Sequence, residues 1–238
     1  MALPFFYIRE YDPGQNEIEL DEENSRHVVQ VLRMKKEDLI SLTDGKGLLL
    51  KAVITGDHKK RCMVTVKEKS LAITPGRKVS IAISLLKNAS RFEWFLEKAT
   101  EIGVSEIIPM ICARTEKEKF RHDRMEAILI SAMLQSQQCW LPTLHEPIGF
   151  ELLLRQEEIV NTSQKFIAHC LEDDERNLIT LVNSALPSQL ILIGPEGDFT
   201  YDEIEFAITN HFYPVSLGDT RLRTETAGIV AATILRTC

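Results

Sequence analysis

Short runs of alternating or β-branched apolar residues dominate the first third of the chain. These runs lie at 5–8, 17–20, 39–44, 48–54 and 62–67. They predict β-strands, because successive side chains of a strand point to opposite faces. Between the third and fourth runs, Asp44–Gly47 is typical of a hairpin turn. A short helix is expected to begin near Asn24 or Ser25 and to carry His27–Leu32. The pattern predicts a small β-barrel over residues 1–73.

The pattern changes after Thr74-Pro75-Gly76, which is typical of a linker. Apolar runs of strand length lie at 79–86, 104–111, 166–170, 189–194 and 213–218. Helical patterns separate them, including 91–103, with Gly103 as a C-cap, and roughly 123–138. Strands that alternate with helices predict an α/β domain with a mainly parallel sheet over residues 77–238.

Two loops of this second part carry candidate binding residues, because ligands of parallel sheets bind at the carboxyl ends of the strands. In Ile193–Phe199, two glycines allow a backbone to approach a ligand closely, and the following helix opens with the T-x-x-E spacing of a capping box at Thr200 and Glu203. Many ordinary strand–helix turns have the same composition, so the loop alone does not establish a site.

The second loop, Gly218–Thr226, contains two arginines that can bind an anion, Arg221 and Arg223. Thr224 is expected to cap the following helix, and Glu225 suits the dipole of its first turn. A capped helix with solvated charges explains these residues equally well. Because the two loops belong to consecutive strand–loop–helix units, we expect them to lie side by side.

Charge is distributed unevenly between the two parts. The chain has 28 Lys and Arg against 35 Asp and Glu, a formal charge of −7. Residues 1–75 hold 12 of each sign, so the remainder carries the whole deficit. Within the neutral part, Lys46–Lys69 holds seven basic residues and only two acids, Asp57 and Glu68. This stretch is either a solvated hairpin face or a local patch that approaches a polyanion.

Several classes of protein are excluded. No apolar run approaches the roughly 20 residues of a membrane span, and the first residues lack the pattern of a secretory signal. The five cysteines (62, 112, 139, 170 and 238) are scattered, which fits a reducing cytoplasm and predicts no zinc site. The motifs G-x-G-x-x-G after the first α/β strand, G-x-x-x-x-G-K-[ST], H-E-x-x-H and G-x-S-x-G are absent. We therefore expect a cytoplasmic protein without a metal.

Four segments, in the correct order, resemble a known family. They are HVVQVLR at 27–33, a pattern in 91–109 formed by Arg91, Glu93, Lys98, Glu101, Gly103 and Pro109, IGPEGDF at 193–199, and SLG with LRTETA at 216–227. Together they resemble the RsmE family of ribosomal RNA uridine N3-methyltransferases in the SPOUT superfamily, over nearly the whole chain.

This resemblance implies a fold, a cofactor and partners. The fold is an N-terminal PUA-like β-barrel that grips RNA, followed by a SPOUT α/β domain with a deep trefoil knot at about 189–238. The enzyme is a homodimer that uses S-adenosylmethionine to form N3-methyluridine in the decoding region of 16S ribosomal RNA, as free RNA or in the small subunit. The resemblance assigns cofactor binding to Leu192, Ile193, Gly194, Pro195, Glu196, Gly197, Leu217, Gly218, Leu222, Arg223, Thr224 and Thr226.

Catalytic and RNA-binding roles follow from the same resemblance and from the chemistry. Uracil N3 is a poor nucleophile until it loses its proton, so a cation near a uracil carbonyl favours the reaction. Arg223 is the candidate cation. Glu225 either assists departure of the proton or serves only as a partner of the helix dipole. The candidate RNA contacts are Arg33, Lys59, Lys60, Arg61 and Arg91.

The chain departs from the family pattern in two places. Asp198 stands where the family often has the second glycine of P-E-G-G, and Leu134 and Gln138 replace a glutamate and an arginine. RNA or dimer contacts by the latter segment are therefore not expected to carry over. Two alternatives share the same fold: a SPOUT methyltransferase for another RNA site, and a ribosome assembly factor without catalysis. Weak cofactor binding would favour the assembly factor.

Overall fold

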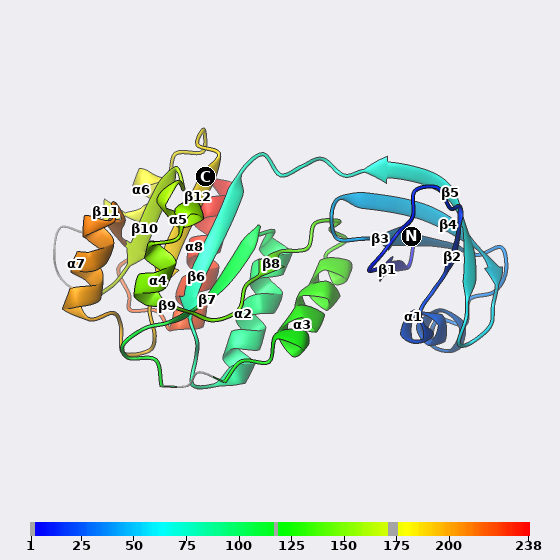
Figure 1. Cartoon of the computed structure of the whole chain (residues 1–238), viewed down its shortest axis with the longest axis horizontal. Coiled ribbons are helices and arrows are strands. Elements are labelled where there is room, and N and C mark those ends of the chain that lie inside the picture. The colour runs from blue at the N-terminus through cyan, green and yellow to red at the C-terminus, as the bar shows by residue number, and fades with distance from the viewer. Residues whose placement is uncertain (1–2, 117–118, 171–175) are drawn as a thin grey trace. The chain divides into compact units, whose positions relative to one another are not determined.

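The structure is a computed structural model that describes residues 3–116, 119–170 and 176–238. It divides into two compact units, drawn together in Figure 1. Unit 1 comprises the chain up to Thr74 together with Met133–Leu141, and unit 2 comprises Pro75–Ala132 and Pro142–Cys238. The segment Met133–Leu141, which the sequence-based division assigns to the second part, therefore groups with the first.

Unit 1 is built on a curled five-stranded sheet (Figure 1). In sheet order the strands are β1 (Phe5–Tyr7), β3 (Leu39–Thr43), β4 (Leu48–Gly56), β5 (Met63–Leu71) and β2 (Glu17–Glu19). β1 pairs with β3 in parallel, and the other pairs are antiparallel. The alternating apolar residues enclose one core that includes Phe6, Ile40, Leu42, Leu50 and Val64, all buried. The predicted hairpin is confirmed between β3 and β4, with Gly45 and Gly47 at positive φ.

The predicted short helix is present but begins earlier than expected. α1 (Glu22–Arg26) has Asp21 as its N-cap, whose Oδ1 accepts a hydrogen bond from Asn24 N at 2.7 Å. A π-helical turn, η1 (His27–Val31), continues it. Ser25 is buried, and its hydroxyl donates to Leu20 O (3.0 Å) and accepts from Cys62 N (2.9 Å). These two hydrogen bonds fix the helix against the sheet. A helix capped by Asp21 was missed because Asn24 and Ser25 are also strong capping residues.

The segment Met133–Leu141 completes unit 1 around the hairpin turn. Gly47 N donates to Cys139 O and Leu141 N donates to Gly45 O, both at 2.8 Å. The Trp140 ring occupies the space that a Cβ at Gly47 would need, and its Nε1 donates to Ile73 O at 3.2 Å. Gly47 is therefore required by close packing as well as by its positive φ.

Unit 2 is a parallel sheet covered by helices. In sheet order its strands are β11 (Arg176–Asn177), β13 (Tyr213–Ser216), β10 (Gln164–Ala168), β12 (Ser188–Ile193), β6 (Lys78–Ser84), β7 (Glu106–Ile111) and β8 (Thr143–Leu144), with β9 (Ile148–Gly149) also paired to β7. Each pairing among the described strands is parallel, as predicted. The helices are α2 (Ala89–Ile102), α3 (His122–Gln135), α4 (Phe150–Leu154), α5 (Glu157–Val160), α6 (Leu178–Leu181), α7 (Tyr201–Thr209) and α8 (Thr224–Thr237). The last turn of α3, from Met133, groups with unit 1.

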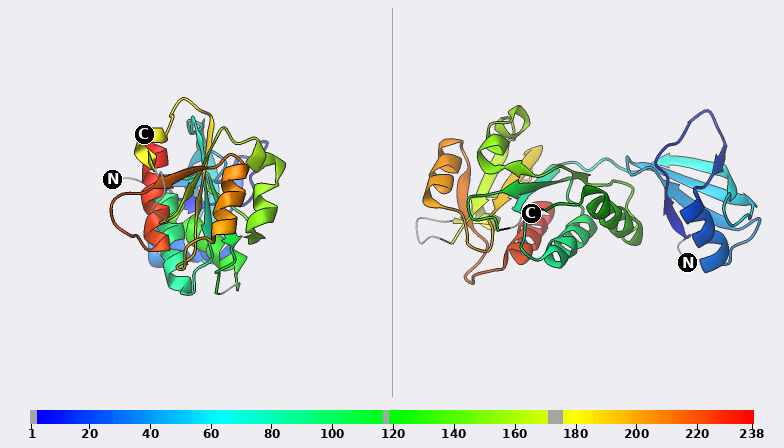
Figure 2. Two further views of the ribbon diagram at one scale, coloured as in Figure 1. Left: turned by 90° about the vertical axis from the view of Figure 1, so that its left-hand side faces the viewer. Right: turned by 60° about the horizontal axis from the view of Figure 1, so that its bottom comes forward.

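Helices lie on both faces of this sheet (Figure 2, left). On one face α8 packs against α2, β6 and β12. The close approach of α8 depends on Gly228, because a Cβ there would lie 2.6 Å from Phe95 Cε2. On the other face α4, α5 and α7 bury apolar side chains against the sheet, where Leu190 and Leu192 join their core. Strands buried on both faces explain why the runs are continuously apolar.

The local signals for two helices behave as predicted. α2 has Asn88 as N-cap, whose side chain accepts from Ser90 N, and ends at Gly103 with φ +89°. α7 begins with a complete capping box formed by Thr200 and Glu203. The expectation that Thr224 caps α8 is wrong. Arg223 is the N-cap residue, because its carbonyl accepts the first helical bond from Ala227 N (2.8 Å).

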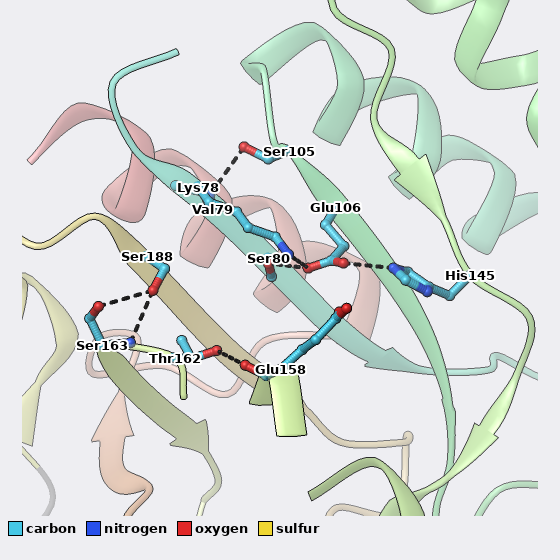
Figure 3. A network of polar contacts seen from close by, with 10 residues as sticks. All are labelled: Lys78, Val79, Ser80, Ser105, Glu106, His145, Glu158, Thr162, Ser163 and Ser188. Carbon is cyan, nitrogen blue, oxygen red and sulfur yellow. Dashed lines mark hydrogen bonds and ion pairs between the residues drawn. The ribbon is translucent and has the colours of Figure 1, made fainter. Parts of the chain in front are cut away.

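A buried carboxylate joins the amino ends of the central strands (Figure 3). Glu106 at the start of β7 is 5% exposed and accepts from Ser80 Oγ (2.5 Å), Lys78 Nζ (2.9 Å) and His145 Nε2 (2.7 Å). Burial alone would raise the pKa of the Glu106 carboxyl, but the bonds from His145, Ser80 and Lys78 outweigh it and lower the pKa to about 2. Since an ionised carboxylate only accepts, His145 Nε2 carries the proton.

Within the described ranges, no helix has the length and apolar character needed to cross a membrane.

Candidate functional site

A cavity of about 600 Å³ opens at the carboxyl ends of three strands of unit 2. Its volume lies within the range of small-molecule sites. The lining residues fall into four groups: Ala168, His169 and Cys170 at the end of β10; Ile193, Gly194, Pro195, Glu196 and Asp198 from the end of β12 onward; Ser216, Leu217, Gly218, Asp219, Thr220, Arg221, Leu222 and Arg223 from the end of β13 onward; and Thr224 and Ala227 in α8. Both loops that the sequence analysis selected therefore contribute to one cavity.

The two loops are not neighbours in the sheet, and the expectation that they lie side by side is wrong in this respect. β10 runs between β12 and β13, and its last residue, Ala168, pairs with Ile193 on one side and Val215 on the other. The end of β10 thus separates the loops. The sequence predicted β10 as a strand, but consecutive order along the chain says nothing about a third strand inserted between two others.

The loop after β12 turns sharply against the core. Gly194 is buried, and a Cβ there would lie 3.0 Å from the Phe199 ring, which is 2% exposed. Asp198 N donates to Pro195 O at 2.9 Å and closes the turn. Gly194 therefore serves packing at the same time as it exposes its backbone to the cavity.

The loop after β13 is more open. Gly218 has φ +130°, and a Cβ there would meet nothing within 4 Å. Arg221 and Arg223 are exposed, and three carboxylates also line the cavity, those of Glu196, Asp198 and Asp219. The anion site that the two arginines suggested is thus balanced by acids, and the lining suits a ligand that carries positive charge.

Most residues that the resemblance assigned to a cofactor line this cavity. Three do not: Leu192 is fully buried in the core, Gly197 packs against Arg114, and Thr226 lies between two lining residues of α8, Thr224 and Ala227, without lining the cavity itself. Nine lining residues had not been assigned to the cofactor: Ala168, His169 and Cys170 at the end of β10, and Asp198, Ser216, Asp219, Thr220, Arg221 and Ala227. The end of β10 had a usable signal, because the run at 166–170 was expected to be a strand of the same parallel sheet.

The two catalytic candidates have different surroundings. Arg223 lines the cavity. Glu225 is 6% exposed and is not among the lining residues, although it adjoins Thr224, which is. Its Oε1 lies 3.6 Å from Arg91 Nε in α2, while no donor among the described residues reaches Oε2. A buried carboxylate oxygen without a donor is uncommon and calls for an explanation.

The basic candidates of unit 1 fall into two groups. Arg61 donates two hydrogen bonds to the Glu19 carboxylate (2.8 and 3.0 Å), and Lys60 Nζ lies 3.3 Å from Glu22 Oε1. The hydrogen bonds from Arg61 lower the pKa of the Glu19 carboxyl. Arg33 and Lys59 are exposed and form no ion pair with any described residue. Arg33 also has φ +56°, an unusual backbone conformation for a side-chain-bearing residue.

Cys62, Cys112 and Cys139 are buried, which raises the pKa of each thiol, whereas Cys170 and Cys238 are exposed. Across the part of the chain that the structure describes, no group of three His, Cys, Asp or Glu side chains could hold a metal ion.

Comparison with known proteins gives consistent matches. Residues 74–236 match a family model described as an RNA methyltransferase domain, and residues 20–67 match an RNA methyltransferase PUA domain. The ribosomal RNA small subunit methyltransferase E of Synechocystis sp. is 32% identical over 86% of this chain and 68% of its own length.

Two solved structures are similar over almost their whole length. A probable rRNA-methyltransferase from Porphyromonas gingivalis has 35% identity and a TM-score of 0.87, with 97% of this chain and 95% of that chain covered. A ribosomal RNA small subunit methyltransferase E from Neisseria gonorrhoeae, solved bound to S-adenosyl methionine, has 28% identity, a TM-score of 0.88 and coverage of 99% and 98%. The chain belongs to the RsmE family of RNA methyltransferases, as its four motifs predicted.

Proposed function

We propose that this protein transfers a methyl group from S-adenosylmethionine to N3 of a uridine in small-subunit ribosomal RNA. The observation that carries the proposal is the cavity at the ends of β10, β12 and β13, which gathers two of the three family segments of the second unit, 193–199 and 216–227. A relative of similar fold is solved with this cofactor. The product is N3-methyluridine in the decoding region of 16S ribosomal RNA, as the family resemblance implies.

The residues of the cavity fit this cofactor. Its sulfonium and amino groups are cationic, and the exposed carboxylates of Glu196 and Asp219 line the cavity. Neither Gly194 nor Gly218 has a side chain, and a Cβ at Gly218 would meet nothing within 4 Å, so the backbone amide and carbonyl groups of these residues can bind the polar edge of an adenine. Nine of the twelve residues that the resemblance assigns to the cofactor contribute to the lining.

In the proposed reaction, the bond from N3 to the methyl carbon forms as the bond from sulfur to that carbon breaks, and N3 loses its proton. The cofactor supplies an electrophilic methyl group. Arg223 donates hydrogen bonds to a uracil carbonyl and stabilises the negative charge that develops as the proton leaves. Its guanidinium is exposed at the N-terminus of α8, so it is available to a second ligand beside the cofactor.

The proposed proton acceptor is Glu225. Its Oε2 is buried and has no donor among the described residues, so the oxygen retains an unused acceptor position, one residue along the chain from the lining residue Thr224. Arg91 near Oε1 keeps the carboxylate oriented. Glu225→Gln is expected to lower turnover at saturating substrate and to leave cofactor affinity unchanged. Unchanged turnover would return Glu225 to its role at the helix dipole.

The remaining features of the family complete the proposal. They are a PUA-like barrel in unit 1 that binds RNA, a trefoil knot formed at about 189–238, a homodimer, and a cytoplasmic location where ribosomes assemble. In unit 1, Arg33 and Lys59 support RNA binding better than Lys60 and Arg61, because the latter two already pair with acids. In unit 2, Arg91 remains a candidate RNA contact beside its ion pair with Glu225.

Two exposed thiols allow a direct test of the cavity. Cys170 lines it, whereas Cys238, also exposed, does not. S-adenosylmethionine is expected to slow alkylation of Cys170 by iodoacetamide and to leave Cys238 unchanged, as followed by peptide mass spectrometry. Equal rates with and without the cofactor would contradict the assignment.

The substrate is tested by mapping methylated nucleotides in ribosomal RNA from cells with and without the protein. Loss of one N3-methyluridine in 16S RNA is the expected result. Loss of a different modification would favour another RNA site. No loss, combined with failure to bind the cofactor, would favour an assembly factor.

A further inference from the structure

The turn after β12 contains an aspartate in a backbone conformation that glycine usually adopts. Asp198 has φ +64°, and the family pattern often has glycine at this position. Aspartate and asparagine tolerate this left-handed region better than most residues, at a modest cost. The backbone alone therefore does not require a carboxylate here, and the side chain needs a separate explanation.

Its two oxygens connect separate segments of the cavity wall. Oδ1 accepts from Phe199 N at 2.8 Å, which is local to the turn. Oδ2 accepts from Cys170 N at 2.9 Å, 28 residues away in sequence. Asp198 and Cys170 both line the cavity. One carboxylate thus links the end of β10, between the two loops, to the turn after β12.

The turn is itself held from its other side. Arg114, which follows β7, donates from Nη1 to Gly197 O (2.6 Å) and Phe199 O (3.2 Å). Glu203, already part of the capping box of α7, also accepts from Ala113 N at 2.8 Å. Because these contacts anchor residues 197–200, the bond from Asp198 transfers that anchoring to the backbone at Cys170.

We propose that Asp198 is a positioning residue of the cavity, which fixes the end of β10 against the turn after β12 and thereby raises affinity for S-adenosylmethionine. The inference rests on the proposed function, because it names the ligand of the same cavity. Both of its hydrogen bonds are made to backbone N–H groups, so the residue acts through the position of its neighbours. A glycine retains the backbone conformation but makes neither bond.

Three variants distinguish how the backbone conformation, the hydrogen bonds and the charge of Asp198 each contribute to cofactor affinity. Asp198→Asn keeps an acceptor oxygen and tolerance of positive φ but removes the charge. Asp198→Gly keeps only the backbone conformation. His211→Gly is the matched control, because His211 is an exposed residue of unit 2 with φ +66° and lies outside the cavity lining. Affinity for S-adenosylmethionine is measured by calorimetry, exchange of the Cys170 amide hydrogen by NMR, and folding by thermal denaturation.

Asp198→Gly is expected to weaken affinity about tenfold, as loss of a charge-assisted hydrogen bond would, and to speed exchange at Cys170. Asp198→Asn is expected to stay within about threefold of the unaltered protein and His211→Gly to match it. Asp198→Gly with unchanged affinity or unchanged exchange would overturn the proposal. Asp198→Asn as weak as Asp198→Gly would also overturn it, in favour of direct attraction between the carboxylate and the ligand.

These measurements distinguish failure of the proposed function from failure of the role proposed for Asp198. If the unaltered protein does not bind S-adenosylmethionine, that function is contradicted. Exchange at Cys170 is measured without ligand, so accelerated exchange in Asp198→Gly still supports the link between the two segments, and unchanged exchange still overturns it.

Discussion

Polar groups have opposite environments at the two ends of the parallel sheet in unit 2. At the amino end, Glu106 is buried and its carboxylate accepts from three side chains. At the carboxyl end, glycines and exposed charges surround a cavity of about 600 Å³. The two sites lie on different strands of one sheet, because the carboxylate network joins β6, β7 and His145 after β8, whereas the cavity lies at the ends of β10, β12 and β13.

This comparison separates stability from binding. A buried carboxylate with saturated acceptors contributes to the free energy of unfolding and offers nothing to a ligand. A cavity wall with accessible backbone and unsatisfied charge is available to a ligand and adds less to stability. Substitutions at the two ends should therefore affect different measurements, and the predictions below test that separation.

The largest effect is expected at the carboxyl end. Arg223→Ala should lower turnover by roughly 10²–10³-fold, the loss typical of one donor to a developing oxyanion. Affinity for S-adenosylmethionine and the free energy of unfolding should change little, because the side chain is exposed. Arg223→Lys should rescue poorly, since it lacks the planar fork of donors. Steady-state kinetics measure the turnover of these variants, and calorimetry measures their affinity for S-adenosylmethionine. If Arg223→Ala lost turnover only because it no longer bound the cofactor, Arg223 would have a binding role and not a catalytic one.

At the amino end, Glu106→Gln should lower the free energy of unfolding by about 1–3 kcal/mol, because the buried amide keeps one acceptor oxygen and turns the other into a donor that faces the donors of Lys78, Ser80 and His145. Cofactor affinity should be unchanged. Glu158→Gln, an exposed acid of the same unit, is the control and should stay within about 0.5 kcal/mol. Urea denaturation measures both variants. Weaker cofactor binding in Glu106→Gln would break the separation between the two ends.

Acid titration sharpens the same prediction. The Glu106 carboxyl has a pKa of about 2 in the folded protein, against a reference value of 4.5. A lowered pKa gives stability that is fully present above pH 4.5 and is lost as the pH falls towards 2. Unfolding free energies measured between these pH values should decrease less steeply for Glu106→Gln than for the unaltered protein. Parallel curves would mean that other groups dominate acid unfolding.

Substitution of Gly194 is expected to lower both the stability of the protein and its affinity for the cofactor. Gly194→Ala places a Cβ 3.0 Å from the buried Phe199 ring, so it should cost about 1–2 kcal/mol of stability and weaken cofactor binding. A larger valine would disturb the core as well as the cavity. Gly76→Ala is the control, because its Cβ would meet nothing within 4 Å. Calorimetry and thermal denaturation should detect both losses. A loss of only one would show that the two roles are separable.

The smallest effect is expected in unit 1. Arg33→Ala should weaken RNA binding a few-fold and reduce its salt dependence by about one unit of slope. Arg61→Ala should have less effect, because Glu19 already pairs with that guanidinium. Filter binding of a 16S RNA fragment at several salt concentrations compares the two. Equal losses would mean that RNA displaces Glu19.

Local chemistry made much of this structure predictable. The hairpin at Asp44–Gly47, the Gly103 cap and the Thr200–Glu203 capping box all depend on residues close in sequence. Competing local signals limited other predictions. Thr224 resembles a cap, yet the helix begins one residue earlier because the carbonyl of Arg223 accepts its first bond.

Long-range arrangements were not predictable from these signals. The insertion of β10 between β12 and β13 is decided by packing across the whole sheet. The bond between Asp198 and Cys170, and the network around Glu106, likewise join residues far apart in sequence. The sequence therefore indicated which loops form the cavity and that 166–170 is a strand, but not that this strand lies between the two loops or which contacts hold them.

The segment Met133–Leu141 has a consequence for synthesis of the protein. Unit 1 needs Cys139 and Leu141 to pair with its hairpin turn and Trp140 to cover Gly47. A growing chain cannot complete this unit when Thr74 has been made. It must wait until Leu141 leaves the ribosome, on the order of several seconds later at roughly 5–20 residues per second. During that interval the turn and its buried glycines remain open to solvent, so the N-terminal unit finishes folding only after much of unit 2 has been translated.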